Sequence, residues 1–275
     1  MNARAVAAWS ASCLFIVLST TNPAYKVMVL AAALAALAAG AGLRRIRGLL
    51  VAVLLIAAFA MLLNFVSAHL GATVLFSLPA QIPALGGPYT LEALAFGASG
   101  GITIAAAILS AAPFSLLLDS HEVMDALPAP LSRSGVVIAS SLNLVPAVAT
   151  SFVQVTEAQR LRGWRPRGPR SWMEVVVPLV LTSVEDSIQL AESMEARGFG
   201  SGARTTMASH ALRRSDWLLV AASGLALAAF AISRAAGWAV DWFPYPTLTV
   251  PTIHPWPTAA CLLLFAPVLV WRSRP

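Results

Sequence analysis

Hydrophobic positions divide the chain into long apolar runs and one polar stretch. Residues 48–91 contain no charged side chain if His69 is neutral, and residues 93–118, 217–233 and 255–271 are also uncharged. A helix that crosses a bilayer needs about 17 to 25 mostly apolar residues. Each of these four runs is therefore long enough to contain one membrane-spanning helix.

Two shorter apolar runs precede them, at roughly residues 5–20 and 27–43, with Thr20-Thr21-Asn22-Pro23 between them. This pattern predicts a tight hairpin of two short helices. The six runs together predict an all-α fold, a polytopic helical membrane protein with about six spans of which the first two are short. A cleaved signal peptide is the alternative for residues 1–20. Against it, Arg4 alone supplies the basic end, and a second apolar run follows directly.

The polar stretch between the apolar runs predicts three further helices. The first is short and amphipathic, at residues 119–130. The second covers about residues 134–162, with a kink predicted at Pro146 because proline interrupts helical hydrogen bonding. The third covers about residues 171–197. We expect the last two to be long amphipathic helices joined by a hinge.

Composition and charge place this polar stretch on one side of a membrane. The chain has 58% hydrophobic and 11% charged residues, whereas about a quarter of the residues of a soluble domain are charged. If both termini and residues 119–215 share one side, that side holds 16 of the 18 basic residues and leaves Lys26 and Arg234 opposite. Because basic residues concentrate on the cytoplasmic side, we expect both termini in the cytoplasm.

The same reasoning predicts three parts of the chain. They are N-terminal transmembrane helices at 1–118, a cytoplasmic domain at 119–215 and C-terminal transmembrane helices at 216–275. The pI of about 10.3 follows from the arginines of the cytoplasmic side. Membrane topology and a docking surface explain it, so the lipid bilayer is an expected partner and nucleic acid is not.

Two short basic segments each end one of the long predicted helices. They are Glu157-Ala158-Gln159-Arg160-Leu161-Arg162-Gly163 and Met194-Glu195-Ala196-Arg197-Gly198-Phe199, whose final arginines lie 35 residues apart. Glycine accepts the left-handed backbone that closes a helix, and a C-terminal arginine gains about 0.3–1 kcal/mol from the last carbonyls. One such ending is ordinary helix termination. Two on consecutive helices indicate equivalent docking points for a soluble partner, and the residues by themselves leave both explanations open.

The other motifs predict neither catalysis nor metal binding. His121-Glu122 lacks the second histidine of a His-Glu-x-x-His zinc site, and the chain has no Gly-x-x-x-x-Gly-Lys-Ser/Thr loop for ATP. Cys13 and Cys261 lie in predicted spans and are expected to be free, buried thiols. We therefore expect a non-catalytic chain that binds no metal or cofactor itself.

At the two arginine endings the chain closely resembles the transmembrane T component of energy-coupling factor (ECF) transporters, the ABC-type vitamin and metal-ion importers of prokaryotes. In that family a proline-led helix ends in Ala-Gln-x-Ala-Arg-Gly, and the next apolar helix ends in Met-Glu-Ala-Arg-Gly-Phe. Leu144-Val145-Pro146 through Gly163, and Val177-Pro178-Leu179 through Phe199, match this pattern in order and spacing.

The resemblance extends to the N-terminal hairpin, with three departures. Thr21-Asn22-Pro23-Ala24-Tyr25-Lys26 is similar to the family's Asp-Pro-Arg-x-Lys segment, with Asn22 and Ala24 in place of aspartate and arginine. At the first ending, the bulkier Leu161 stands where the family usually has alanine. None of these departures changes Arg162 or Gly163.

The resemblance implies a coupling subunit in a prokaryotic plasma (inner) membrane, with residues 119–215 as its cytoplasmic coupling domain. Its partners would be two cytoplasmic ABC-type ATPase subunits, which bind ATP and Mg, and one small hydrophobic substrate-binding S component. Arg162 and Arg197 would be the ATPase-docking anchors, and Gly163, Ala196 and Gly198 would permit close approach. The coupling helices would be supported by Glu157, Ala158, Gln159, Glu195, Pro146 and Pro178. The substrate would be a vitamin or a transition-metal ion.

Two other functions remain as alternatives. An ordinary ABC permease subunit has a coupling loop that begins Glu-Ala-Ala, which residues 157–163 resemble loosely, but it has one such element per half. An integral membrane transferase needs clustered aspartates that hold magnesium. Glu185-Asp186 is the only adjacent acidic pair of the chain, and a solvated helix face also explains it.

Overall fold

A computed structural model describes residues 2–79, 86–118, 132–198 and 213–272. Contacts divide the chain into two compact units: Met1–Val123 with Ala211–Pro275, here called the membrane unit, and Met124–His210, here called the hairpin unit. The short helix predicted at 119–130, with His121-Glu122, lies outside the described residues.

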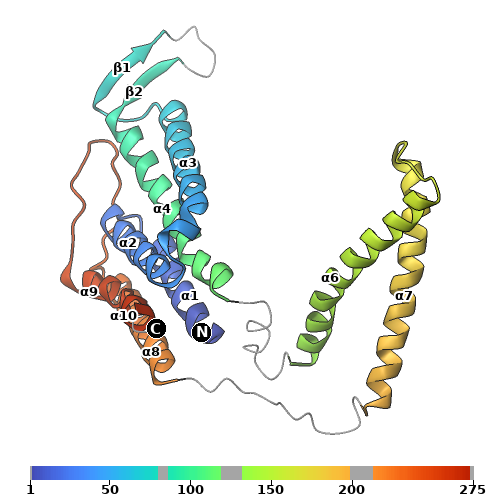
Figure 1. The fold of residues 1–275 in the computed structure, drawn as a ribbon. Helices are drawn as coiled ribbons and strands as arrows, with labels where there is room; N and C mark the ends of the chain where they lie inside the picture. Colours follow the sequence, from blue (N-terminus) through green and yellow to red (C-terminus); the bar gives the residue numbers. More distant parts are fainter. Residues whose placement is uncertain (1, 80–85, 119–131, 199–212, 273–275) are drawn as a thin grey trace. The chain divides into compact units, whose positions relative to one another are not determined.

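The membrane unit is built from apolar helices, as the sequence predicts (Figure 1). Four helices in the described parts of the chain are long and apolar enough to cross a membrane, and Ala3–Ser19 and Pro255–Val270 are shorter apolar helical stretches. The polytopic helical fold is therefore confirmed. Its helices are α1 (Ala3–Ser19), α2 (Pro23–Gly40), α3 (Leu43–Ser67), α4 (Leu91–Leu116), α8 (Arg214–Ala235), α9 (Pro255–Leu263) and α10 (Ala266–Arg272).

The turn between α1 and α2 forms where the sequence places it. The side chain of Asn22 caps α2, because its Oδ1 accepts a hydrogen bond from the N–H of Ala24 at 3.0 Å. Pro23 occupies the first helical position, where its missing N–H costs nothing. Asparagine and aspartate cap helices about equally well, so the departure at Asn22 preserves the local structure.

A β-hairpin between α3 and α4 is an addition to the predicted all-α fold. Strands β1 (Val74–Leu78) and β2 (Gly87–Thr90) pair antiparallel, and the rings of Phe76 and Tyr89 stack with centroids 4.6 Å apart. The uncharged run 48–91 therefore holds most of one helix, α3, and both strands of the hairpin. Charge alone does not distinguish these, since a short apolar run is compatible with helix or strand.

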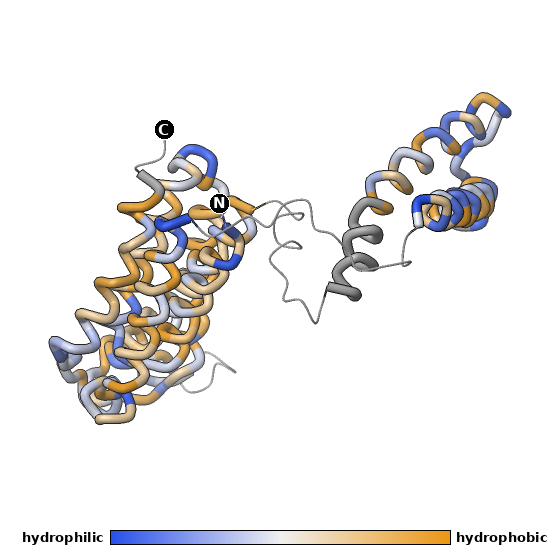
Figure 2. The backbone as a smooth tube through the Cα atoms, turned by 90° about the horizontal axis from the view of Figure 1, so that it is seen from below, coloured by the Kyte–Doolittle hydropathy of each residue, from blue (hydrophilic) through white to orange (hydrophobic). Residues whose placement is uncertain are grey.

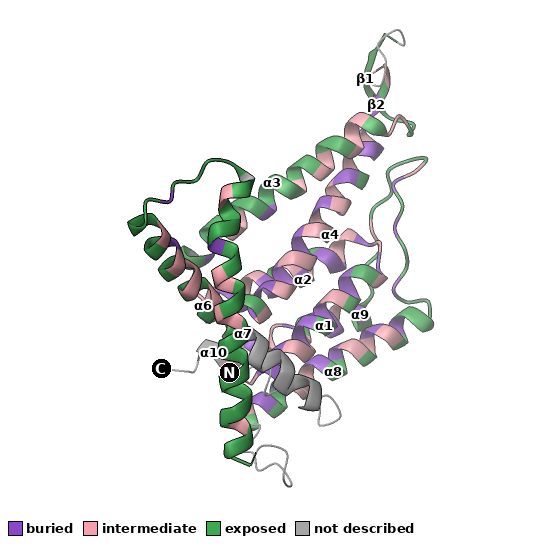
Figure 3. Cartoon of the chain, turned by 90° about the vertical axis from the view of Figure 1, so that its right-hand side faces the viewer, coloured by how far each residue is buried: buried purple, intermediate pink, exposed green. Residues whose placement is uncertain are grey.

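The core of the membrane unit is made by α1, α2, α4 and α8. Trp9, Tyr25 and Phe230 are fully buried, and Figure 3 shows buried positions concentrated along α1, α2 and α4. The Trp9 indole N–H donates to the carbonyl of Leu264 at 2.9 Å, which satisfies the one polar atom of a large apolar side chain. Cys13 and Cys261 are free and buried, as expected.

Small residues let α4 approach α3 closely. A Cβ added at Gly97 would lie 2.8 Å from the carbonyl oxygen of Met61, and one at Gly101 would lie 2.8 Å from that of Ala57. These glycines are four residues apart and form the small-xxx-small spacing that allows close helix contact in lipid. Gly100, by contrast, has open space at this position.

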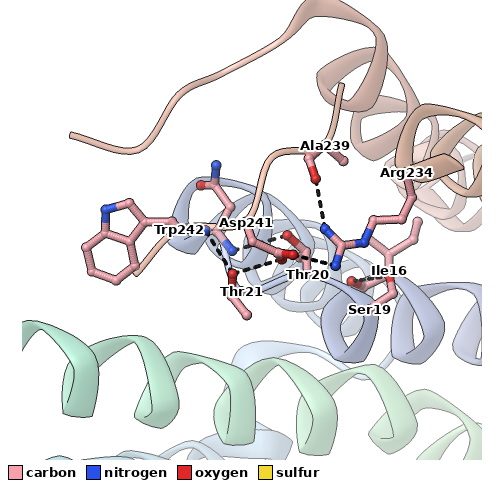
Figure 4. Close-up of polar contacts among 9 residues, drawn as sticks. Ile16, Ser19, Thr20, Thr21, Arg234, Ala239, Asp241 and Trp242 are labelled. Atoms are coloured by element: carbon pink, nitrogen blue, oxygen red, sulfur yellow. Dashed lines mark hydrogen bonds and ion pairs between the residues drawn. The ribbon is translucent and has the colours of Figure 1, made fainter. Parts of the chain in front are cut away.

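A group of polar contacts, here called the polar clasp, ties the α1–α2 turn to the segment after α8 (Figure 4). Arg234 and Asp241 form an ion pair at 2.7 Å. Thr21 donates to Asp241 at 3.0 Å and accepts from the N–H of Trp242 at 2.9 Å. The hydrogen bond from Arg234, assisted by the Thr21 hydroxyl, lowers the pKa of Asp241. Residues about 220 positions apart are thereby held together.

The hairpin unit contains two long helices joined by a short turn. They are α6 (Ser132–Leu161) and α7 (Met173–Ala196), with the 3-10 helix η2 (Pro169–Trp172) between them. These bounds agree with the predicted helices at 134–162 and 171–197. Both helices continue through their internal prolines, Pro146 and Pro178. Figure 2 shows hydrophilic and hydrophobic residues mixed in α7 and in the coloured second part of α6.

Candidate docking sites at two helix ends

The end of α6 is closed by backbone hydrogen bonds around Gly163. The N–H of Gly163 donates to the carbonyl of Arg160 at 3.0 Å, and the N–H of Trp164 donates to that of Gln159 at 2.9 Å. Gly163 has φ +89°, a left-handed conformation that glycine adopts without steric cost. Arg162 is therefore the last residue before a glycine-closed helix end.

The end of α7 has the same local structure. The N–H of Gly198 donates to the carbonyl of Glu195 at 2.8 Å, and Gly198 has φ +73°. The N–H of Arg197 donates to the carbonyl four residues earlier at 3.2 Å, as does that of Arg162. The two arginines thus occupy equivalent positions on consecutive helices.

Neither arginine side chain is needed to end its helix. Arg162 and Arg197 are both exposed, and neither guanidinium has a hydrogen bond or ion pair with a residue that the structure describes. The glycine-closed turns already satisfy carbonyls of the last turn. Stabilisation of the helix end is the ordinary role of such an arginine. Here that role gives the five N–H donors of each guanidinium no partner among the described residues.

The two ends lie at opposite ends of a helical hairpin. The α6 end is at the turn, whereas the α7 end is 24 residues further along α7, about 36 Å away at 1.5 Å per residue. Figure 1 shows α6 and α7 joined at the turn and diverging from it. A rigid element with one arginine at each end is able to contact two separate partner surfaces.

The turn itself is held by a compact set of contacts. The indole N–H of Trp164 donates to the carbonyl of Ser171 at 2.8 Å, and the Ser171 hydroxyl accepts from the N–H of Arg167 at 2.9 Å. Gln159, predicted as a supporting residue, donates through Nε2 to the carbonyl of Glu174 at 3.0 Å. It therefore links the last turn of α6 to the first turn of α7.

An aromatic cluster that the sequence analysis missed completes this turn. The ring of Trp172 stacks on Phe152 with centroids 6.1 Å apart and meets Trp164 edge to face at 5.2 Å. Trp164 and Val175 are buried. In the sequence, this cluster is indicated by Trp164 and Trp172, which flank the linker that contains glycine and proline. Tryptophans supply large contact areas when they are buried.

Beyond this cluster, α7 exposes a continuous apolar face. Val177, Leu181, Val184 and Ile188 follow one another at helical spacing, and each is about half exposed or more. Figure 3 shows α7 as exposed over most of its length. Exposed apolar patches of this kind mark interaction sites.

Most of the other predicted site residues lie close to the two ends, whereas Pro146 and Pro178 lie inside α6 and α7. Leu161, the departure from the family pattern, is 91% exposed. Its larger side chain therefore makes little contact with the described part of the hairpin unit. Four further predicted residues are also exposed: Glu157, Ala158, Glu195 and Ala196.

Fold and helix ends together define a class of protein: a multi-pass helical membrane component with a hairpin of two long helices that presents two equivalent arginines. The comparison with known families is more specific. Residues 1–207 match the family described as CbiQ, cobalt transport protein, and the chain belongs to this family of ECF transporter T components. It is thus a cobalt transport membrane protein and a component that works in a complex with other subunits. A search of the curated proteins found no match.

Proposed function

We propose that this chain is the transmembrane coupling subunit of an ECF-type importer. It transmits the ATP-driven movement of two cytoplasmic ABC-type ATPases to a substrate-binding S component. The observation that carries the proposal is the equivalence of Arg162 and Arg197. Both follow the last turn of a helix, both precede a left-handed glycine, and both extend a guanidinium that is unpaired among the described residues.

Arginine is suited to the proposed contact. Its planar guanidinium pairs bidentately with carboxylates, and anchors buried in an interface are often worth about 2 kcal/mol or more each. The glycine that follows each arginine has no Cβ, so a partner's backbone can approach closely. We therefore assign ATPase docking to Arg162, Gly163, Ala196, Arg197 and Gly198.

The hairpin provides a physical route for coupling. The two ATPases move relative to each other during the ATP cycle, and each would hold one end of an element about 36 Å long. The aromatic cluster and the Gln159 bond keep the α6–α7 turn rigid. The exposed apolar face of α7 suits contact with a hydrophobic S component.

The proposed assembly also assigns location and chemistry. Both termini and the hairpin unit are cytoplasmic, at the inner membrane of a prokaryote, because this arrangement puts 16 of 18 basic residues on one side. ATP and Mg bind to the ATPase subunits, and this chain is not catalytic. The substrate resides in the S component. The family's description favours cobalt over a vitamin.

The test is affinity purification of the tagged chain from mild detergent, from cells that express the neighbouring genes. We expect two P-loop ATPases and a small, very hydrophobic protein to accompany the wild type. The Arg162→Ala/Arg197→Ala variant should lose the ATPases while remaining in the membrane. A wild-type chain that purifies alone would overturn the proposal and return attention to the transferase alternative and Glu185-Asp186.

A further inference from the structure

The described residues around the two arginine ends, which are equivalent in backbone geometry, carry opposite charge. Between residues 157 and 174, at the α6 end, the chain has five arginines and two acidic residues, a formal net charge of +3. Between residues 185 and 198, at the α7 end, it has four acidic residues and one arginine, a net charge of −3. All of these charged side chains are exposed.

The arginines of the α6 end are carried by an ordered turn. Arg165, Arg167 and Arg170 alternate with residues that hold the turn's backbone, and the N–H of Arg167 is itself bonded to the Ser171 hydroxyl. The same hydroxyl donates to the carbonyl of Gly168 at 2.8 Å. A preformed turn loses little conformational entropy when it binds, so its charges are available at fixed positions.

None of these arginines forms an ion pair with a residue that the structure describes. The one ion pair found among the described residues is Arg234–Asp241, in the membrane unit. Every cation at the α6 end is arginine; the chain's only lysine is Lys26. Arginine prefers bidentate pairing with carboxylate or phosphate. A dense, unpaired and ordered arginine surface is therefore complementary to an anionic partner.

We propose that the two docking ends are electrostatically distinct: the α6 end binds an ATPase groove rimmed by carboxylates, and the α7 end binds a groove without such a rim. The inference rests on the proposed function, which supplies the ATPase partners. It adds that the α6 end captures its ATPase through long-range attraction. The α7 end relies on Arg197 and short-range contacts. Complementary charge of this kind raises association rates by about 10- to 1,000-fold, and salt weakens the effect.

An ATPase groove fits the α6 end better than an anionic lipid surface does. Leu161 protrudes between Arg160 and Arg162 at the end of a rigid helix. Arginine is enriched among the residues that anchor protein–protein interfaces, and an exposed apolar side chain beside two arginines adds apolar surface that a protein groove buries. Trp164, which a lipid interface would attract, is instead buried inside the turn.

The test measures association of the wild-type complex's ATPase subunits with the full-length chain in nanodiscs of zwitterionic phosphatidylcholine. Sodium chloride is varied from 50 to 300 mM. The triple variant Arg165→Gln/Arg167→Gln/Arg170→Gln removes charge and leaves the backbone bonds of the turn intact. The matched control, Arg165→Lys/Arg167→Lys/Arg170→Lys, keeps the charge.

We expect the glutamine variant to associate about tenfold more slowly at 50 mM salt and to show a flatter salt dependence, with the lysine variant close to wild type. Glu185→Gln/Asp186→Asn/Glu192→Gln at the α7 end should not slow association. If the wild type binds the ATPases and the glutamine variant binds with the same rate and salt dependence, the charge distinction is wrong and the proposed function stands.

Two other outcomes also contradict the inference. A salt dependence that appears only in nanodiscs containing anionic phosphatidylglycerol would assign the arginines to a membrane surface. A wild-type chain that binds no ATPase at any salt concentration would overturn both this inference and the proposed function.

Discussion

The membrane unit and the hairpin unit bury their side chains to very different degrees. In the membrane unit, Trp9, Tyr25 and Phe230 are fully buried, and the polar clasp joins residues from distant parts of the sequence. In the hairpin unit, the described burial is concentrated at the turn, around Trp164 and Val175. Lipid is able to cover the apolar exterior of the first unit. The second has an apolar face and two unpaired arginines that only a partner would cover.

The difference indicates which substitutions should affect folding and which should affect assembly. Changes inside the membrane unit remove contacts that the chain makes with itself, so they should lower its stability. Changes to exposed residues of the hairpin unit would remove contacts with partner subunits, and would leave the contacts within the described chain in place. They should leave the isolated protein stable and impair transport.

The largest effect is expected from Arg162→Ala/Arg197→Ala. If each anchor contributes about 2 kcal/mol or more to docking, the double variant should lose uptake of radioactive cobalt to background. Each single variant should retain part of the uptake. The variant's amount in the membrane and its thermal midpoint in detergent should equal those of the wild type.

The matched control for this double variant is Arg44→Ala/Arg45→Ala, two exposed arginines at the start of α3. It removes the same charge from the other unit and should preserve uptake. Normal uptake by the Arg162/Arg197 double variant would contradict the assignment of the docking residues.

The next largest effect should come from Gly97→Ala and Gly101→Ala in the membrane unit. Each new Cβ would lie 2.8 Å from a backbone oxygen of α3, and overpacking of this kind costs about 1–3 kcal/mol. We expect each variant to lower the thermal midpoint by several degrees. Gly100→Ala is the control, since its Cβ meets open space and alanine favours helix over glycine by about 1 kcal/mol. Equal midpoints for all three variants would show that close α3–α4 packing contributes nothing.

A smaller effect, on assembly alone, is expected from Leu181→Asn/Ile188→Asn on the exposed face of α7. Both side chains are more than half exposed, so the isolated chain should change by less than about 0.5 kcal/mol. Recovery of the hydrophobic partner in affinity purification should fall. Val175→Asn, at a fully buried position one turn or more away, should instead destabilise the chain. Undiminished recovery with the exposed pair would remove α7 as the partner's contact surface.

The smallest effect should come from the polar clasp. Because the ion pair lowers the pKa of Asp241, its stabilisation is present above the ordinary aspartate pKa of about 3.9 and is lost as pH falls through the lowered value. Exposed ion pairs contribute about 0–1 kcal/mol. We expect the thermal midpoint of the wild type to fall slightly below pH about 4. The fall should be smaller in Asp241→Asn. An unchanged pH profile in that variant would exclude the clasp as its cause.

Local features of this protein were predictable from neighbouring residues. The glycine-closed ends at Gly163 and Gly198, and the Asn22-Pro23 start of α2, depend on backbone preferences of a few adjacent residues. The polar clasp was not predictable, because Thr21 and Asp241 meet only after the helices between them have packed. The β-hairpin was also missed, since an uncharged run indicates burial or lipid but not the backbone conformation within it.

The sequence by itself determined the polytopic helical class, the long helices and the two arginine endings, because hydropathy over about 20 residues and local capping chemistry act within one segment. The tertiary structure decided which glycines of α4 touch α3 and how Gln159, Trp164 and Trp172 hold the turn. It also decided that both guanidinium groups remain unpaired at opposite ends of one hairpin. Those features depend on distances between residues far apart in the chain, which packing sets and local preference does not.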